Sequence, residues 1–530
     1  MSVIPTINKK RVYKQLKAAS KQDWDIIVIG SGMASMSCAA ALSKMGNKVL
    51  VLEKHYIPGG MTHMFQRGKY NWDVGVHALG EMDPKKQIGK LISWLTDSQI
   101  KMNFLNDPYD SFFWPEFEIG FPTDSQEFKQ VLKERFPQEQ TKIDQYFNLC
   151  HKVSKEAKLF FALKSLPKKV DISINSVLKV FKKSYWETTT KEALDSIGIS
   201  QKLQAVLTAQ WGYYGSLPKR SSFAIHALTS VHFWGGAYYP IGGAKEIAAN
   251  ILNVVNINGG EVLCNAEVQE VLIKKNKAYG VKMVTGEEFH ARKIISGASA
   301  QISVSNFLPQ SYQNKDWVKS IMKLNTSPPY ICLYMGFKGD IAKAKATSTN
   351  WWFNKNFDVT QENWDFENEK SADILYVSFP SLKDPTYDPG EEQLHTGECV
   401  TFMPWELFEK WQNTDFKNRD EEYKKIKAEI QESIINQLKS HMPDIMQYLD
   451  FAELSTPLTT NHFCNTIKGA IYGLEATPER FTCTDLRPKT PIKNFYLTGI
   501  DTAAPGVVGA MSSGVLTAAN IHPNLYLKMI

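Results

Sequence analysis

The residues near the amino terminus that are best suited to bind a ligand are a glycine-rich turn at residues 30–35 and an acid, Glu53. Gly30 allows a tight turn, and Gly32 lets the backbone approach a phosphate closely. A helix that begins after this turn would offer free N–H groups and the positive end of its dipole to phosphates. Glu53 follows 23 residues after Gly30, where a carboxylate can accept hydrogen bonds from ribose hydroxyls. This spacing predicts a dinucleotide site.

The elements that must position this turn are visible in the surrounding pattern. Residues 25–29 form a short apolar run rich in β-branched side chains, as expected for a buried parallel strand. Residues 33–45 are typical of a helix that ends at Gly46, and residues 48–53 predict a second strand. Ser35 occupies the position of a third small residue and is still small enough for close packing of helix on strand. The segment therefore predicts a βαβ unit.

Two later segments differ from what an enzyme that binds only NAD would have after its first βαβ unit. Residues 54–77 contain the glycine pair Gly59-Gly60 and an aromatic hairpin in place of another helix. Near the carboxyl end, a strand ending at Gly499 is followed by Asp501 and by a helix of small residues from Pro505. This order of motifs resembles the flavin amine oxidase and phytoene desaturase superfamily. The resemblance implies FAD as the cofactor.

The resemblance also assigns roles to these segments. It implies that the second glycine pair lies along the pyrophosphate and ribityl chain, that Asp501 binds the same region, and that the backbone at Val268 brackets the adenine. The amino terminus of the last helix would point at the flavin N1–O2 edge. The predicted cofactor-binding residues are Gly30, Ser31, Gly32, Met33, Ala34, Ser35, Glu53, Lys54, Gly59, Gly60, Met61, Thr62, Val268, Gly499, Asp501, Val508 and Gly509.

From about residue 25 to 520 the chain is similar to the retinol saturases, within a branch that includes carotenoid isomerases. The segments that support this similarity include residues 59–65, 73–80, 235–243 and 379–386. Met61 and Thr62 replace a cysteine pair expected there, and the family's signal-bearing amino terminus is absent. The resemblance implies an FAD-dependent oxidoreductase that reduces a C=C bond of an apolar polyene, with hydride from flavin N5 and a separate proton. Desaturation, cis–trans isomerisation and non-enzymatic binding of a prenyl lipid are the alternatives.

Such a reaction needs a proton donor and an apolar tunnel. The resemblance places His77 beside the isoalloxazine ring, and His63 is near it in sequence, so both are candidate catalytic residues; the alternative for each is a structural histidine. Trp234, Tyr238 and Tyr239 are candidates for the substrate tunnel, against the alternative of core packing. Only one dinucleotide fingerprint follows a strand, so electrons are expected from a transiently bound NAD(P)H or from an electron-donor protein.

The predicted fold class is α/β, with a Rossmann-type FAD-binding domain assembled from discontinuous segments and an inserted α+β substrate domain. The FAD-binding segments are expected at 23–95, 235–305 and 485–530, and the substrate domain at 96–234 and 306–484. Residues 1–22 are expected to form a basic extension.

Composition excludes several classes of protein. The chain has 530 residues and a net charge of +6, too small an excess to indicate nucleic-acid binding. Its seven cysteines form no CxxC pair and no metal-ligand spacing, which favours a reducing compartment. No signal peptide or transmembrane helix is expected, so we predict a cytoplasmic protein. Residues 152–186 combine nine lysines with apolar residues, and we predict a peripheral membrane contact there, against the alternative of a solvated helix packed on the substrate domain.

Overall fold

A seven-stranded sheet built from three distant parts of the chain organises one half of the computed structural model, which describes residues 19–181, 184–358 and 364–528. Its strand order is β10-β2-β1-β13-β12-β11, and β19 pairs with β13. All pairs among β10, β2, β1, β13 and β19 are parallel, as a βαβ fold requires. The strands are β1 (Trp24–Ile29), β2 (Val49–Leu52), β10 (Glu261–Leu263), β11 (Val268–Lys274), β12 (Lys277–Met283), β13 (Glu288–Ser296) and β19 (Phe495–Leu497).

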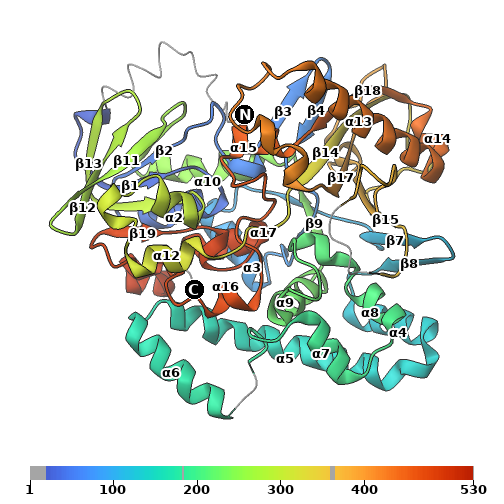
Figure 1. Cartoon of the computed structure of the whole chain (residues 1–530), viewed down its shortest axis with the longest axis horizontal. Helices are drawn as coiled ribbons and strands as arrows, with labels where there is room; N and C mark the ends of the chain where they lie inside the picture. The colour runs from blue at the N-terminus through green and yellow to red at the C-terminus, as the bar shows by residue number, and fades with distance from the viewer. Residues whose placement is uncertain (1–18, 182–183, 359–363, 529–530) are drawn as a thin grey trace.

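Three helices cover this sheet, and the first and last of them pack tightly together (Figure 1). They are α2 (Met33–Lys44), α10 (Lys245–Ile257) and α17 (Gly506–Ile521). Every residue of α2 from Met33 to Ser43 is buried, which explains its small side chains. A Cβ atom on Gly514 of α17 would lie 2.3 Å from the Ala34 carbonyl oxygen, so this contact requires glycine.

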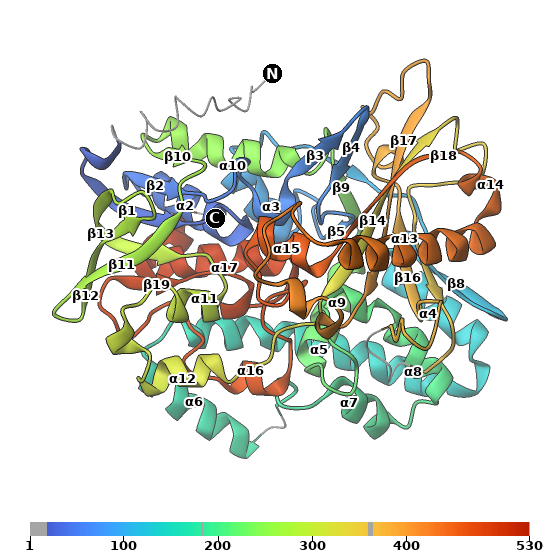
Figure 2. The ribbon, with the colours of Figure 1, turned by 45° about the horizontal axis from the view of Figure 1, so that its top comes forward.

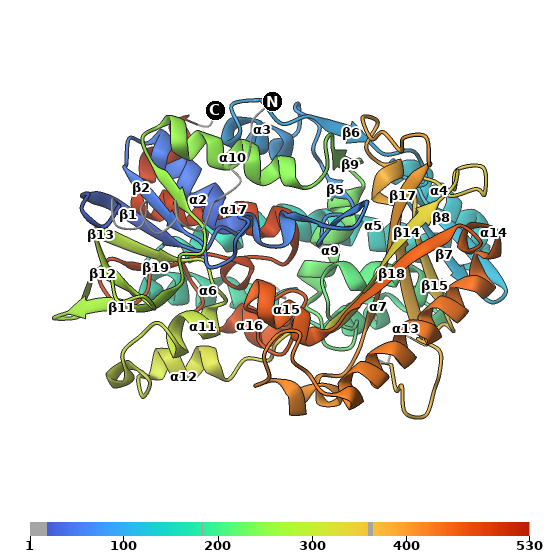
Figure 3. The ribbon, with the colours of Figure 1, turned by 90° about the horizontal axis from the view of Figure 1, so that it is seen from above.

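A second seven-stranded sheet forms the other half of the molecule, in the order β18-β14-β17-β16-β15-β7-β8. Helix α13 (Glu421–His441) lies along this sheet in Figure 3 and buries Tyr423, Ile430, Ile434 and Leu438 in the same core as β14. The strands are β7 (Asp110–Trp114), β8 (Phe117–Phe121), β14 (Tyr330–Lys338), β15 (Asn350–Asn354), β16 (Ile374–Ser378), β17 (Leu394–Phe402) and β18 (Leu449–Ser455).

Small sheets and a layer of helices connect the two halves. Figures 1 and 2 show α5 running beneath both halves, with α6 at the periphery. The connecting strands are β3 (Met64–Arg67), β4 (Tyr70–Asp73), β5 (Leu79–Gly80), β6 (Met102–Phe104) and β9 (Ala237–Pro240). The remaining helices are α3 (Gln87–Leu95), α4 (Ser125–Arg135), α5 (Gln140–Lys164), α6 (Lys168–Phe181), α7 (Thr190–Ile197), α8 (Gln201–Leu207), α9 (Phe223–Phe233), α11 (Ala300–Ser305), α12 (Asp316–Met322), α14 (Pro443–Met446), α15 (Pro457–Cys464) and α16 (Pro478–Thr482).

The predicted α/β fold class, with a Rossmann-type parallel sheet assembled from distant segments, is confirmed. The first βαβ unit follows the sequence closely, because apolar strands and a small-residue helix leave little choice of arrangement. Among the described residues, no helix is long and apolar enough to cross a membrane.

Candidate active site

A cavity of about 1160 Å³ joins the parallel sheet to the helical layer. One end is lined by the β1–α2 turn, by the 3-10 turn at Gly60–Thr62 and by the start of α17. The other end reaches α5 and α9. Pockets for a single small ligand usually hold roughly 300–1,000 Å³. The cavity therefore has room for a large cofactor together with a second molecule.

The cofactor end is built from glycine turns that leave backbone exposed. Gly30 has φ +88° and Gly60 has φ +56°, a region that favours glycine. A Cβ on Gly60 would lie 3.0 Å from the Gly32 Cα, so the two turns lie against each other and side chains there would fill the cradle. This arrangement fits a cofactor that passes close to the backbone.

Two helices begin at the cavity without a side-chain cap. α2 begins after its N-cap residue Gly32, and α17 begins after its N-cap residue Pro505. Neither N-cap residue has a side chain that accepts a hydrogen bond from the helix backbone. Neither helix has an acidic residue in its first turn. Free N–H groups and two positive dipole ends therefore face the same space. The pair is suited to the pyrophosphate at one helix and to a region of developing negative charge at the other, so the residues present fit FAD.

Glu53 lies where the ribose of such a cofactor would bind. Its Oε2 accepts hydrogen bonds from the Ser31 amide (2.8 Å) and hydroxyl (2.6 Å), and its Oε1 accepts one from the His55 amide (2.7 Å). A carboxylate has about four acceptor positions, so one remains for a ribose hydroxyl. Glu53 thus both orders the glycine turn and retains capacity for a ligand.

Asp501 is held more tightly. Its Oδ1 accepts a hydrogen bond from the Leu474 amide (2.8 Å) and its Oδ2 accepts one from the Ala300 amide (2.7 Å). The side chain is buried at the cavity wall. Asp501 therefore connects two chain segments as well as facing the predicted ribityl region.

Sixteen of the seventeen predicted cofactor residues line the cavity, and Ser35 is the exception. The Ser35 side chain is fully buried and packs closely against Gly297, which itself lines the cavity. A Cβ on Gly297 would lie 1.7 Å from the Ser35 hydroxyl oxygen. The absence of a side chain at Gly297 therefore makes room for Ser35, the third small residue of the glycine-rich turn. The sequence pattern alone did not indicate this role for Gly297.

Replacing Glu53 by alanine is expected to weaken FAD binding roughly ten- to a hundredfold, because a hydrogen bond to a charged group contributes about 1.5–3 kcal/mol. Titration of the apoprotein with FAD measures this change, and excess FAD should restore the holoprotein. Glu261→Ala, on β10 and away from the cavity, is the matched control. Unchanged affinity in both Glu53→Ala and Asp501→Ala would show that the motif is misplaced.

His77 lines the cavity beyond the β3–β4 hairpin. Its Nδ1 lies 3.0 Å from Oε2 of Glu398, a fully buried residue of β17, although the alignment of the two groups is not that of a hydrogen bond. Burial, and then the nearby Lys383 charge, lower the pKa of His77 to about 3. The imidazole is therefore neutral at physiological pH, and it can relay a proton by accepting one at one nitrogen while it releases another from the second nitrogen.

A buried lysine lies directly behind His77. Lys383 is fully buried, and its Nζ donates hydrogen bonds to the His77 carbonyl (2.7 Å), to the Ser378 hydroxyl (2.7 Å) and to the Asn350 side-chain oxygen. Asn350 in turn donates to Asp110, also fully buried, at 2.8 Å. Lys383 thus connects the backbone of the candidate catalytic residue to the second sheet.

Burial determines the charge of this cluster. It raises the pKa of Asp73 to about 7, with a further rise from the Glu398 charge, and it raises the pKa of Glu398 well above its ordinary value. It lowers the pKa of Lys383 to about 7. The Tyr239 hydroxyl donates a hydrogen bond to Asp73. These shifts mean that carboxyl groups close to the cavity can hold a proton near neutral pH.

His63 also lines the cavity, but its Nδ1 is already engaged in a hydrogen bond to the backbone. Its Nδ1 donates a hydrogen bond to the Gly60 carbonyl (2.5 Å), and burial lowers the pKa of His63 to about 4. This contact holds the second glycine turn in place, so the geometry favours a structural role for His63.

The three aromatic residues predicted for the tunnel do not line the cavity. Trp234 stacks on Phe147 at 4.4 Å, Tyr238 packs edge-on against Phe104, and Tyr239 turns inwards to Asp73. The composition of the segment did not indicate which side each ring faces. The apolar end is instead lined by Phe161, Tyr213, Leu228, Val231 and Phe233, among others.

Comparisons with known proteins agree with this geometry. Residues 33–522 match the family described as flavin containing amine oxidoreductase. An all-trans-retinol 13,14-reductase of Danio rerio is 31% identical, with 98% of this chain and 90% of that protein covered. Prolycopene isomerase 1, chloroplastic, of an Oncidium hybrid cultivar is 26% identical over 97% of this chain and 86% of its own. Cyclohexylamine oxidase from Brevibacterium oxydans, 14% identical, shares the fold with a TM-score of 0.55 over 96% of this chain and all of that chain.

Proposed function

Because the chain belongs to the flavin-containing amine oxidoreductase family, we propose that it is an FAD-dependent enzyme that reduces a C=C bond of an apolar polyene such as a retinoid. The single observation that supports this most is the cavity itself. It runs from the glycine turns to an apolar end, and the neutral His77 lines it. An uncharged, elongated substrate fits such an end better than an amine does.

The residues of this chain would divide the work as follows. Gly30, Gly32, Glu53 and Asp501 hold the cofactor, and the apolar side chains of α5 and α9 exclude water and orient the polyene. Reduced flavin, when bound, supplies a hydride. An isolated alkene also needs a proton at its other carbon, and we propose that this proton arrives through His77.

Electrons must enter from outside the chain. We propose a transiently bound NAD(P)H or an electron-donor protein as their source, because the sequence has a single dinucleotide fingerprint. Stopped-flow mixing of the oxidised protein with NADPH under anaerobic conditions separates the two: direct bleaching of the flavin favours the nucleotide.

The experiment that tests the proposed reaction is anaerobic incubation of the photoreduced protein with all-trans-retinol, with a carotenoid and with a polyunsaturated fatty acid, followed by mass analysis. We expect a retinoid product heavier by two hydrogens. A product lighter by two hydrogens would indicate desaturation. An unchanged mass with altered retention would favour isomerisation, the second candidate, which the similarity to prolycopene isomerase supports. A protein that purifies without flavin would contradict both.

A further inference from the structure

Exposed apolar side chains are concentrated in one stretch of the chain, at the end of α5 and the start of α6. Among the described residues, five of twelve exposed large apolar side chains lie within residues 159–174, and each is 37–52% exposed. The other seven are scattered through the rest of the chain. Exposed lysines lie among and before the five. We call this the α5–α6 surface: Leu159, Leu166, Val170, Ile172 and Ile174, with Lys152, Lys155, Lys158, Lys168 and Lys169.

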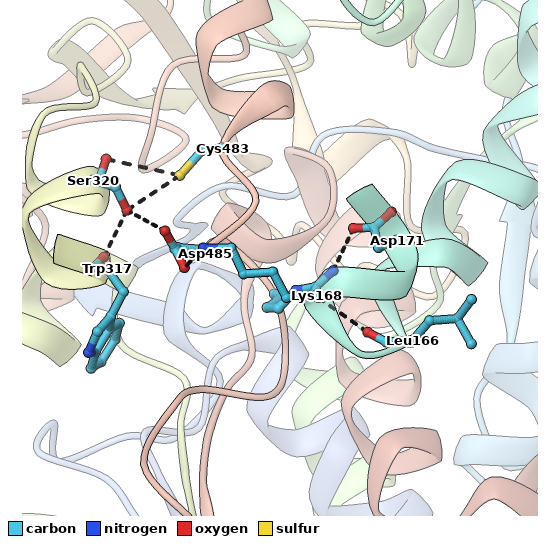
Figure 4. A network of polar contacts seen from close by, with 8 residues as sticks. Leu166, Lys168, Asp171, Trp317, Ser320, Cys483 and Asp485 are labelled. Carbon is cyan, nitrogen blue, oxygen red and sulfur yellow. Dashed lines mark hydrogen bonds and ion pairs between the residues drawn. The ribbon is translucent and has the colours of Figure 1, made fainter. Parts of the chain in front are cut away.

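This surface is held in place by a polar network beneath it (Figure 4). Asp171 and Arg487, both buried, form an ion pair at 2.5 Å, and Arg487 also donates to the Leu166 carbonyl at 3.2 Å. Lys168 pairs with Asp485 at 2.5 Å, and Asp485 accepts a hydrogen bond from Ser320 of α12 at 2.9 Å. The first turn of α6 is therefore fixed to the body, while Val170, Ile172 and Ile174 are exposed in the part of the chain that the structure describes.

The cavity extends to the same stretch of α5. Ser154, Lys158, Phe161 and Ala162 line it, and Leu159 lies between them on the exposed side of the helix. The apolar end of the cavity and the uncovered apolar surface are thus separated by a single helix.

We propose that the α5–α6 surface docks on an anionic lipid bilayer. Apolar side chains next to lysines match a bilayer interface, where the former enter the acyl boundary and the latter meet negative headgroups. A second copy of the chain is a poorer occupant, because its own lysines would face these lysines. The predicted membrane contact at 152–186 included Lys179, Lys182 and Lys183. Residues 182–183, and the side chain of Lys179, lie outside the described part of the chain, so the proposal does not rest on them.

Co-sedimentation of the FAD-loaded protein with vesicles tests this proposal without any substrate. We expect binding to phosphatidylcholine vesicles to strengthen as phosphatidylserine is added and to weaken with salt, because surface charges are screened. The triple variant Lys152→Ala, Lys155→Ala, Lys169→Ala should bind anionic vesicles about 100-fold more weakly, since each lysine contributes a factor of about five.

Two further variants distinguish binding through the α5–α6 surface from attraction of the vesicles to the protein's overall positive charge. Val170→Gln, Ile172→Gln and Ile174→Gln together should weaken binding at every salt concentration, by at least about tenfold. Lys424→Ala, Lys425→Ala and Lys439→Ala together remove the same charge from α13 and should leave binding unchanged. Retained flavin absorbance shows that each variant is folded.

Two results would overturn the proposal: no binding to anionic vesicles, or equal losses in the α5–α6 and α13 lysine variants. Neither result bears on the proposed reduction, because that is tested by product mass with detergent-solubilised substrate. Conversely, vesicle binding by a protein that leaves every polyene unchanged would support the docking surface alone.

Discussion

Lys383→Met is expected to lower the free energy of unfolding by roughly 3–5 kcal/mol, because it removes a buried cation and leaves its acceptors without a donor. The His77 carbonyl and the Asn350 side-chain oxygen would both lose the Lys383 ammonium. The carboxyl groups of Asp110 and Glu398 would lose the Lys383 charge, which lowers the pKa of each. Chemical denaturation of the holoprotein measures the change.

The pH dependence of stability gives a second readout for Lys383. Burial lowers its pKa from 10.5 to about 7, so between these values the unfolded lysine holds a proton that the native one has released. Stability from this group therefore rises as pH increases from about 7 to 10.5 and is lost as pH falls through about 7. Lys383→Met should remove that rise.

Lys164 offers a matched control. It is also a buried lysine whose pKa burial lowers to about 7, but its Nζ donates only to the Leu486 carbonyl, at 3.2 Å. It does not line the cavity. Lys164→Met should flatten the pH dependence similarly, cost less stability and leave turnover unchanged. Equal loss of turnover in both variants would contradict a specific role for Lys383 behind His77.

His77→Ala is expected to slow turnover by a factor on the order of 10² or more while FAD remains bound. With a pKa near 3, His77 holds no spare proton, so it must relay one. In the proposed relay the Glu398 carboxyl, 3.0 Å from Nδ1, first turns into alignment with it, and then gives its proton to Nδ1 as Nε2–H gives its proton to the alkene carbon. Glu398 becomes a carboxylate near Lys383, and solvent restores its proton after the product leaves.

Glu398→Gln tests the source of the proton. It keeps the side-chain shape but cannot release a proton, so turnover should fall as in His77→Ala. Nitrogen NMR of labelled histidine should show a change of tautomer at His77 without any substrate.

His63→Ala should leave turnover nearly intact but weaken FAD binding, because His63 holds the Gly60 turn. Wild-type turnover in His77→Ala would remove His77 from the mechanism.

The cofactor end of the site was predictable because its signals are local. Glycines at fixed spacing, an acid at the end of a strand and a small-residue helix each report on a few neighbouring residues. The cluster behind His77 was not predictable in this way. Lys383, Glu398 and Asp110 come from separate strands and turns, and each is a single charge in an otherwise ordinary segment.

A weak signal for the cluster was nevertheless present. Glu398 lies in β17, directly before the run Cys399-Val-Thr-Phe402, so an acid interrupts a segment typical of a buried strand. Trp234, Tyr238 and Tyr239 do not line the cavity, and the sequence could not show this for a related reason: periodicity identifies a buried ring but not the cavity or core that surrounds it. Gly297 was missed because its partner, Ser35, is far away in the chain.

The contact between α2 and α17 has a consequence for synthesis. The glycine turn after β1 leaves the ribosome early, yet the second helix end that completes the cavity, at Gly506, follows about 470 residues later. Until then, strand β13 of the nascent chain lacks its partner strand β19. The side of α2 that carries Ala34 likewise lacks α17, which packs on it in the complete fold. Any chain interrupted before Gly506 would lack that wall. Cofactor loading should therefore begin only after α17 has been synthesised and has packed on α2.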